Sequence, residues 1–156
     1  MIIESIKSAT YYPLYKYPMQ SMKHFDKVAS ALIKYWERER IEDAQIVFTG
    51  SSGVTAACLL NVALIKNDIS PMSVCRITKE GEESHSGHTG TDDLQQGELV
   101  IIDDFISTGA TMRRIYDALH ASMNANLRVS CIIAKDILDF PHIYKEFFPN
   151  VELLIQ

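Results

Sequence analysis

The chain has 156 residues, 47% of them hydrophobic and 22% charged, which is the size and composition of a globular protein with a substantial buried core. Its formal net charge of -5 gives no general attraction to nucleic acid or to an anionic membrane surface. No apolar run approaches the roughly 20 residues that a membrane-spanning helix needs.

The N-terminal sequence and the cysteines indicate a cellular compartment. The opening stretch MIIESIKSATYYPLYKYP lacks a basic region followed by an apolar core, so we do not expect a signal peptide. Cys58, Cys75 and Cys131 lie far apart, each in an apolar stretch, and none forms a CxxC pair. We therefore expect reduced, buried thiols in a cytoplasmic protein rather than catalytic or metal-binding cysteines.

The first half of the chain predicts a helix, a strand and a second helix. In residues 21–39 apolar side chains recur at helical spacing with charges between them, and Ser21 is the expected N-cap. Residues 44–48 form an apolar strand pattern. The glycine- and serine-rich loop 49–53 follows, and an Ala- and Leu-rich helix is expected over 54–66.

The second half repeats this alternation. A strand is expected over 72–77, and then a long polar stretch with several glycines over 79–96. A loop of that length inside a compact domain is usually functional or disordered. A strand over 98–102, a helix over 109–122 and a buried strand over 127–134 complete the pattern.

The two ends of the chain predict shorter elements. The Tyr- and Pro-rich residues 1–20 are expected to form a short strand and an extended loop, and residues 140–147 and 151–155 a short helix and a last strand. Alternation of helices with continuous apolar strands predicts one α/β domain over residues 1–156, with a mostly parallel, twisted sheet and helices on both faces.

Ligands of such sheets bind beyond the carboxyl ends of the strands, which directs attention to the loops 49–53, 79–96 and 103–111. The last of these contains Ser107, Thr108, Gly109, Ala110 and Thr111. Small residues let backbone N–H groups approach a ligand, and the following helix offers unsatisfied N–H groups and a positive dipole end. This is the chemistry of a phosphate-binding loop, although an ordinary Ser/Thr helix cap is the other interpretation.

Two adjacent acids precede that loop. Asp103 and Asp104 stand directly after the apolar run LVII, and a carboxylate pair at the end of a core strand is costly unless hydrogen-bond donors or a cation meet it. Ribose hydroxyls supply donors, and Mg²⁺ with its waters supplies charge. Acids beside a phosphate-binding loop therefore suit a sugar phosphate.

The stretch LVIIDDFISTGAT resembles the signature of the type I phosphoribosyltransferases, which bind 5-phosphoribosyl-1-pyrophosphate (PRPP). The resemblance implies the fold of that family with a small hood. It implies that Asp103 and Asp104 hold the ribose hydroxyls, directly or through waters of Mg²⁺, and that residues 107–111 bind the 5′-phosphate.

The resemblance extends to two further loops. IVFTGSSGVTAA is similar to the family's pyrophosphate loop, which implies pyrophosphate binding by Thr49, Gly50, Ser51 and Ser52, although a glycine-rich turn opening a helix explains this segment nearly as well. Residues 75–93 stand where the family has its mobile catalytic loop. This position implicates Arg76 and Lys79 in contact with pyrophosphate, and His85, Ser86 and His88 in contact with the substrate or the leaving group. Of these, Lys79, His85 and His88 are the expected catalytic residues.

For His85 and His88 a solvated loop position is an equally good interpretation. Their HxxH spacing lacks a third ligand, so we do not expect a resident metal there.

The implied reaction displaces pyrophosphate from PRPP by a nitrogen nucleophile with Mg²⁺ as cofactor, and family members commonly form homodimers. Ser107 stands where the 6-oxopurine enzymes carry an acid, which argues against a 6-oxopurine acceptor and leaves orotate or an adenine-like base. The pyrophosphate loop lacks the Arg-Gly of the adenine enzymes, however.

The base-binding hood is expected either from the N-terminal segment or from residues 135–149, whose aromatic side chains alternatively pack over the sheet. Two other functions stay open: a non-catalytic PRPP- or nucleotide-binding module, and a phosphatase- or kinase-like enzyme that uses Asp103.

Overall fold

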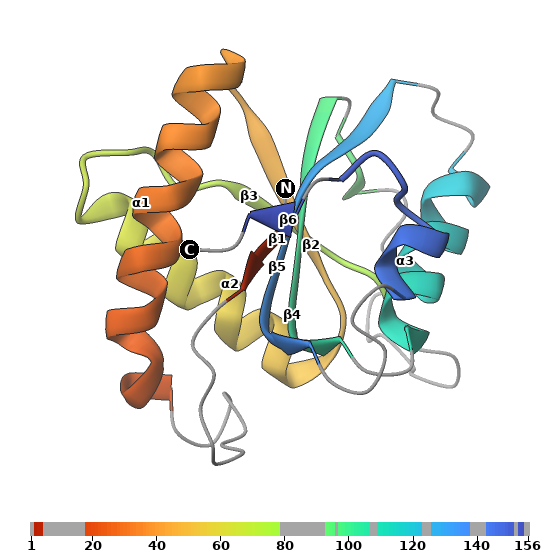
Figure 1. The fold of residues 1–156 in the computed structure, drawn as a ribbon, viewed down its shortest axis with the longest axis horizontal. Coiled ribbons are helices and arrows are strands. Elements are labelled where there is room, and N and C mark those ends of the chain that lie inside the picture. The colour runs from red at the N-terminus through yellow and green to blue at the C-terminus, as the bar shows by residue number, and fades with distance from the viewer. Residues whose placement is uncertain are drawn as a thin grey trace.

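The computed structural model describes residues 2–4, 18–78, 93–95, 97–106, 109–122, 126–137, 143–151 and 153–154. Within these ranges only the backbone is described for residues 2–4, 18, 20, 104–106, 135–137 and 153–154. The described chain forms one sheet flanked by helices (Figure 1). The strands are β1 (Ile2–Glu4), β2 (Ala44–Phe48), β3 (Ser73–Arg76), β4 (Gly97–Ile106), β5 (Leu127–Ile137) and β6 (Leu153–Leu154).

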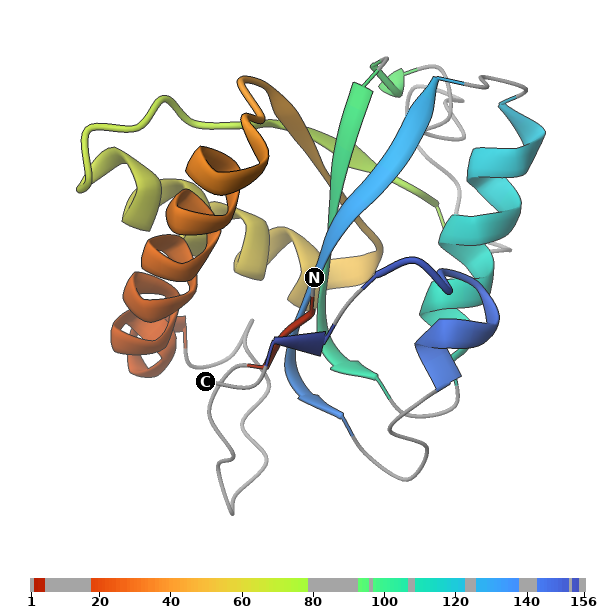
Figure 2. The ribbon, with the colours of Figure 1, turned by 45° about the horizontal axis from the view of Figure 1, so that its top comes forward.

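All neighbouring strands of the sheet run parallel, in the order β3-β2-β4-β5-β1-β6. The helices are α1 (Met22–Glu39), α2 (Gly50–Ile65) and α3 (Ala110–Ala121), with short 3-10 turns η1 (Pro18–Ser21) and η3 (Ile143–Glu146). Figure 2 shows α1 and α2 on one side of the sheet and α3 with η3 on the other. The predicted α/β fold with a parallel sheet and helices on both faces is therefore confirmed.

The alternation of side chains along the strands divides the interior into two layers. In β4, Val100 and Ile102 pack with α1 and α2, whereas Leu99 and Ile101 pack with α3 and η3. All four are almost completely inaccessible to solvent. Because both faces of the sheet are covered at β4, its stretch Leu99–Ile102 is continuously apolar rather than alternating.

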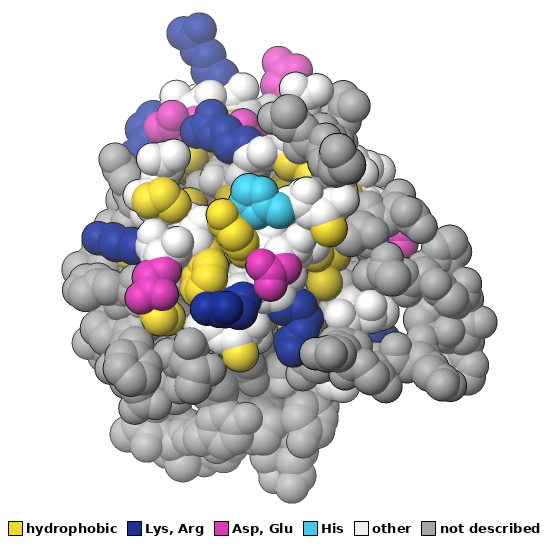
Figure 3. All heavy atoms as spheres, turned by 90° about the vertical axis from the view of Figure 1, so that its right-hand side faces the viewer, with side chains coloured by type: hydrophobic (Ala, Val, Ile, Leu, Met, Phe, Trp, Pro, Cys, Tyr) yellow, Lys and Arg dark blue, Asp and Glu magenta, His cyan; other side chains and the backbone are white. Residues whose placement is uncertain are grey.

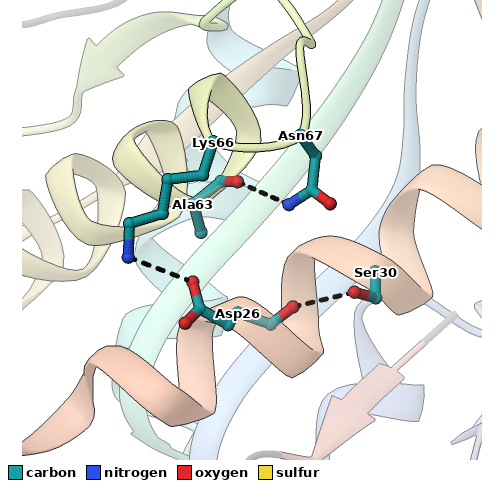
Figure 4. Close-up of polar contacts among 5 residues, drawn as sticks. All are labelled: Asp26, Ser30, Ala63, Lys66 and Asn67. Atoms are coloured by element: carbon teal, nitrogen blue, oxygen red, sulfur yellow. Dashed lines mark hydrogen bonds and ion pairs between the residues drawn. The ribbon is translucent and has the colours of Figure 1, made fainter.

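An ion pair joins α1 to the C-terminal end of α2 at the surface (Figure 4). Lys66 Nζ lies 3.6 Å from Asp26 Oδ1, while Asn67 Nδ2 donates to the carbonyl of Ala63 at 2.8 Å within the end of α2 itself. Both charged side chains are about half exposed. Such a pair contributes no more than about 1 kcal/mol, so packing of the apolar layer holds the two helices together.

Helix α2 begins at Gly50, four residues earlier than predicted. The Gly-Ser-Ser-Gly sequence predicts a loop, but it forms the first turn of the helix. Gly53 explains the difference, because a Cβ at this position would lie 2.9 Å from Cβ of Phe48. The glycine is required for close packing of the helix on β2 rather than for a flexible loop.

Ser21 is the N-cap of α1, as predicted, although its side chain makes no capping hydrogen bond, because the η1 turn continues directly into the helix. Another local prediction differs from the structure. Cys58 is exposed on α2, so the expectation of buried thiols is wrong there. Cys75 and Cys131 are buried, and burial raises the pKa of each thiol to about 12. Among the described residues no helix combines the length and apolar character that crossing a bilayer requires.

Candidate functional site at the carboxyl edge of the sheet

The strand order reverses between β2 and β4. From β2 the chain passes through α2 to β3 on one side, and β4 then pairs with β2 on its other side. In an open parallel sheet this reversal leaves a crevice beyond the carboxyl ends of the two strands. That edge is the lower edge of the sheet in Figure 1, where α2 and α3 begin. The topology therefore assigns the candidate site to this edge.

Asp103 lies in this edge beside the end of β2. The register pairs Val47 with Ile101, so Asp103 and Thr49 stand at the same level, two residues further on. Asp103 is 8% exposed and Thr49 is 5% exposed. Asp104 follows in the strand, and its side chain lies outside the described part of the chain. The structure thus places one carboxylate of the predicted pair at the crevice.

The N-termini of α2 and α3 lie at the same edge. Thr49 is the N-cap of α2 and makes no side-chain capping bond, and the N-cap of α3 is Gly109, which has no side chain. The first backbone bond of α3 runs from Arg113 N to the carbonyl of Gly109 at 2.8 Å. The N–H groups of the preceding first turn have no acceptor within the helix. Two helix N-termini are therefore directed at one crevice, which favours an anion.

Two glycines shape these N-termini. Gly50 has φ 70° and Gly109 has φ 81°, both in the left-handed region that favours glycine. A Cβ on Gly109 would lie only 2.7 Å from Cγ1 of Ile143, so the turn entering α3 is packed against η3. Both positions require glycine for their conformation, and Gly109 requires it for space as well.

Arg76 ends β3 on the opposite side of β2. It pairs with Phe48, is exposed, and is followed by a hydrogen bond from Ile77 N to the carbonyl of Phe48 at 2.9 Å. Since neighbouring strands lie about 4.8 Å apart, Arg76 is separated from β4 by about 10 Å across β2. Its backbone therefore belongs to the same edge as Asp103.

The structure gathers most of the described candidates at this edge: Thr49, Gly50, Ser51, Ser52, Arg76, Asp103, Gly109, Ala110 and Thr111. Six candidates lie outside the described residues: Lys79, His85, Ser86, His88, Ser107 and Thr108. Their placement stays a prediction.

Gln45, which the sequence does not mark as a candidate, holds residues 93–95 in place directly before β4. Gln45 is 3% exposed, and its side-chain amide donates to the carbonyl of Asp93 and accepts from the N–H of Gln95, both at 2.9 Å. Ser73 Oγ adds a bond to Gln95 Oε1 at 3.0 Å. A glutamine within the otherwise apolar strand AQIVF was the available signal. It fixes the point where the chain returns from the predicted catalytic loop.

Replacing Gln45 by leucine is expected to lower the free energy of unfolding by about 1–3 kcal/mol, because two backbone groups lose their partners while the site stays buried. Urea denaturation measures the change. Ser73→Ala is the matched control, since it removes one exposed bond to the same segment and should cost less than about 0.5 kcal/mol. Equal effects of the two variants would show that the Gln45 bonds do not anchor this segment.

A cavity of about 640 Å³ lies elsewhere in the molecule. Its lining includes Leu127 and Val129 of β5 together with Tyr116 and Phe147. Val129 pairs with Leu99, and Asp103 pairs with Ala134, so the cavity lies about 16 Å further back along the strands. Figure 3 shows the face of the molecule that carries α3, where hydrophobic side chains surround a histidine. The cavity is therefore separate from the candidate site.

The structure describes some of the aromatic residues that were candidates for a base-binding hood. Tyr144 and Phe148 belong to the apolar layer beneath α3 and are 0% and 8% exposed. Packing over the sheet, the alternative to base stacking, is the correct interpretation for these two side chains. Phe140 lies outside the described residues.

Among the described residues, no group of three or more His, Cys, Asp and Glu side chains gathers as a metal site. The oxygen ligands at the candidate site nevertheless fit Mg²⁺, which keeps several waters and is usually held by one or two carboxylates together with substrate phosphates. Asp103, nearly buried at the crevice, is such a carboxylate.

Comparison with known proteins establishes the fold. No protein-family model matches the sequence. Adenine phosphoribosyltransferase from Saccharomyces cerevisiae is similar with a TM-score of 0.60 and 16% identity, over 97% of this chain and 90% of that one. Hypoxanthine phosphoribosyltransferase from Trypanosoma cruzi is similar with a TM-score of 0.54 and 12% identity, over 87% and 80% of the two chains. The chain has the type I phosphoribosyltransferase fold.

Proposed function

We propose that the protein is a Mg²⁺-dependent phosphoribosyltransferase that displaces pyrophosphate from PRPP by a nitrogen nucleophile. The observation that carries the proposal is the placement of Asp103 at the switch point of the sheet, between the open N-termini of α2 and α3. A nearly buried carboxylate flanked by two anion-attracting helix ends fits a ribose that carries a phosphate on one side and a pyrophosphate on the other.

Each candidate residue at this edge of the sheet has a role in the proposal. The first turn of α3, entered through Gly109 and containing Ala110 and Thr111, binds the 5′-phosphate together with Ser107 and Thr108. The first turn of α2 binds the pyrophosphate, with Arg76 adding positive charge from β3. Asp103 and Asp104 accept hydrogen bonds from the ribose hydroxyls and orient C1 toward the acceptor.

Catalysis then rests on positioning and on stabilising the charge of the departing pyrophosphate. Mg²⁺, when bound with the substrate, would supply part of the positive charge that stabilises the departing pyrophosphate. Lys79, His85 and His88, in the segment between β3 and β4, are proposed to complete the site and to contact the leaving group. No covalent intermediate with the protein is required.

The proposed acceptor is a nucleobase other than a 6-oxopurine. Ser107 supports this choice, because a serine does not provide the carboxylate that contacts the ring in the 6-oxopurine enzymes. Orotate and adenine-like bases remain as the two classes to compare.

The test is a screen of nucleobases and related amines with PRPP and Mg²⁺, in which pyrophosphate release is measured. We expect turnover with at least one base outside the hypoxanthine, guanine and xanthine group, and loss of turnover when Mg²⁺ is removed by chelation. Turnover restricted to those three bases would contradict the acceptor assignment.

The alternative function is a binding module that has kept the fold without the reaction. Calorimetry with PRPP and Mg²⁺ distinguishes the two: saturable binding with no pyrophosphate release across the whole panel identifies the module, and binding with release identifies the enzyme.

A further inference from the structure

The cavity of about 640 Å³ lies where the sheet is incomplete. Strand β1 pairs with β5 at Ile132–Ala134, so within the described residues the first half of β5 has β4 as its one neighbouring strand. Side chains from α1, from the end of α3 and from residues 147–151 surround the space beside it. Pockets that hold a small organic molecule usually have volumes of about 300–1,000 Å³.

The part of β5 that lines this cavity contains a β-bulge. Val129 and Cys131 pair with consecutive residues of β4, so Ser130 is the extra residue between them. Ser130 is 2% exposed, and its Oγ donates to the carbonyl of Leu99 at 3.2 Å. Bulges redirect neighbouring side chains and are over-represented beside functional sites. The irregularity of the strand therefore coincides with the cavity.

Four neighbouring aromatic rings line the cavity. The ring centroid of Tyr116 lies 4.1 Å from that of His120. It lies 5.7 Å and 6.0 Å from the ring centroids of Phe147 and Phe148. Aliphatic side chains complete this part of the lining: Leu119, Leu127, Val129 and Val151. A planar aromatic molecule gains both stacking and burial of its ring in such surroundings.

The charged and titratable groups of the lining favour an anion. The lining residues include Arg128 and His120 but no aspartate or glutamate. Arg128 is 66% exposed in its side chain, and its ion pair with Glu98 uses Nη1, at 3.5 Å, out of the five N–H donors of a guanidinium. His120 stands in the last turn of α3, where a basic side chain offsets the negative end of the helix. Burial raises the pKa of Tyr35, which nearby Arg128 offsets only in part, so this phenol keeps its proton and adds a donor.

We propose that this cavity binds a small planar aromatic carboxylate, whose ring packs against Tyr116, Phe147 and Phe148 and whose carboxylate binds Arg128. Arginine binds a carboxylate through two parallel N–H bonds, which fix the orientation of the ligand and add affinity. An uncharged aromatic molecule of the same shape gains the packing alone. The proposal does not depend on the transferase activity, because the cavity is separate from the candidate site.

Phe147 connects the cavity with the turn that enters α3. Its ring lines the cavity, and its Cε2 lies 3.5 Å from the position of a Cβ on Gly109. The guanidinium carbon of Arg113, in the first turn of α3, lies 5.6 Å from the centre of the same ring. A ligand that packs on Phe147 therefore changes the surroundings of Gly109. The consequence for phosphate binding rests on the proposed function of this turn.

The first experiment titrates the ¹⁵N-labelled chain with cinnamate and, separately, with cinnamamide, which has nearly the same shape without the charge. Amide signals in NMR spectra report both affinity and location. We expect saturable shifts in residues 127–130 and 147–151, with cinnamate binding at least fivefold more tightly than cinnamamide. No saturation at millimolar cinnamate, or saturable shifts confined to the carboxyl edge around Asp103, overturns the proposal.

Arg128→Gln tests the source of the preference for the anion. We expect cinnamate to bind this variant no more tightly than cinnamamide does, while the affinity for cinnamamide stays as in the wild type. Lys27→Gln is the matched control, because it removes the same charge from an exposed position of α1 outside the cavity. A preference for cinnamate that survives in Arg128→Gln overturns the assignment of the carboxylate to Arg128.

The amide signal of Gly109 tests the connection through Phe147 in the same spectra. In the wild type it should shift along the same saturation curve as the cavity signals. In Phe147→Leu the response of Gly109 should be lost while the signals of residues 127–130 still shift. A Gly109 signal that stays fixed while the wild-type cavity fills overturns this connection. Since no PRPP is present, the result is independent of whether the proposed transferase function holds.

Discussion

Changing Asp103 and Asp104 together to asparagine is expected to reduce pyrophosphate release from PRPP by at least about 100-fold without unfolding the protein. Asparagine keeps the shape of the side chain and one acceptor oxygen but removes the charge. Asp103 is 8% exposed, so its carboxylate is only weakly screened by water and its charge acts strongly on a ligand in the crevice.

Stability is expected to change little. Asparagine has nearly the volume and shape of aspartate and keeps an acceptor oxygen, so the double variant should melt close to the temperature of the wild type. Asp117→Asn, on the exposed face of α3, is the control and should change neither property. Retention of more than half of the activity by the double variant would remove these aspartates from the proposed site.

Gly109→Ala is expected to lower the free energy of unfolding by about 2–5 kcal/mol. The positive φ of 81° accounts for about 1–2 kcal/mol in any residue with a Cβ. The contact of that Cβ with Ile143 Cγ1, at 2.7 Å, adds about 1–3 kcal/mol of overpacking. Thermal or urea denaturation measures the sum, and PRPP binding should weaken because the first turn of α3 shifts.

A double-mutant cycle separates the two causes. Ile143→Ala removes the atom with which the new Cβ collides, so Gly109→Ala made in that background should cost only the conformational part, about 1–2 kcal/mol. If the cost is unchanged in the Ile143→Ala background, the turn entering α3 is not packed against η3 as the structure shows.

The sequence predicted the elements of the fold well where hydrophobic pattern and backbone pairing agree. The boundaries of β2 are those expected, because apolar residues begin and end with the strand. In β4 the pattern ends before Asp103, whereas pairing with β5 continues to Ile106 opposite Ile137. An apolar pattern indicates burial rather than backbone hydrogen bonding. The strand predicted from it therefore ends four residues before β4 does.

Tertiary contacts explain the remaining differences. The sequence predicts a loop for the first turn of α2, since nothing in the local sequence shows that Gly53 packs on Phe48. The sequence predicts a buried Cys58 because the residue lies in an apolar stretch, and that stretch does not distinguish the covered side of α2 from its exposed side. The role of Gln45 depends on partners 48 and 50 residues away.

The location of the candidate site can be predicted from the sequence for a simpler reason. In a parallel sheet, residues that directly follow strands meet at one edge whatever the details of packing. Thr49 and Asp103 were therefore assigned to one crevice before their register was known. The position of the acceptor site cannot be predicted in this way. Tyr144 and Phe148, two aromatic residues proposed to stack on a base, pack in the hydrophobic core instead.

The central claim is that the carboxyl edge around Asp103 binds PRPP, and calorimetric titration tests it without knowledge of the acceptor. PRPP is titrated with excess Mg²⁺ into the wild-type chain, into the Asp103→Asn/Asp104→Asn variant and into Asp117→Asn. We expect saturable binding at one site per chain in the wild type and in Asp117→Asn, weakened at least tenfold in the double variant. No binding to the wild type, or equal binding by all three proteins, would contradict the claim.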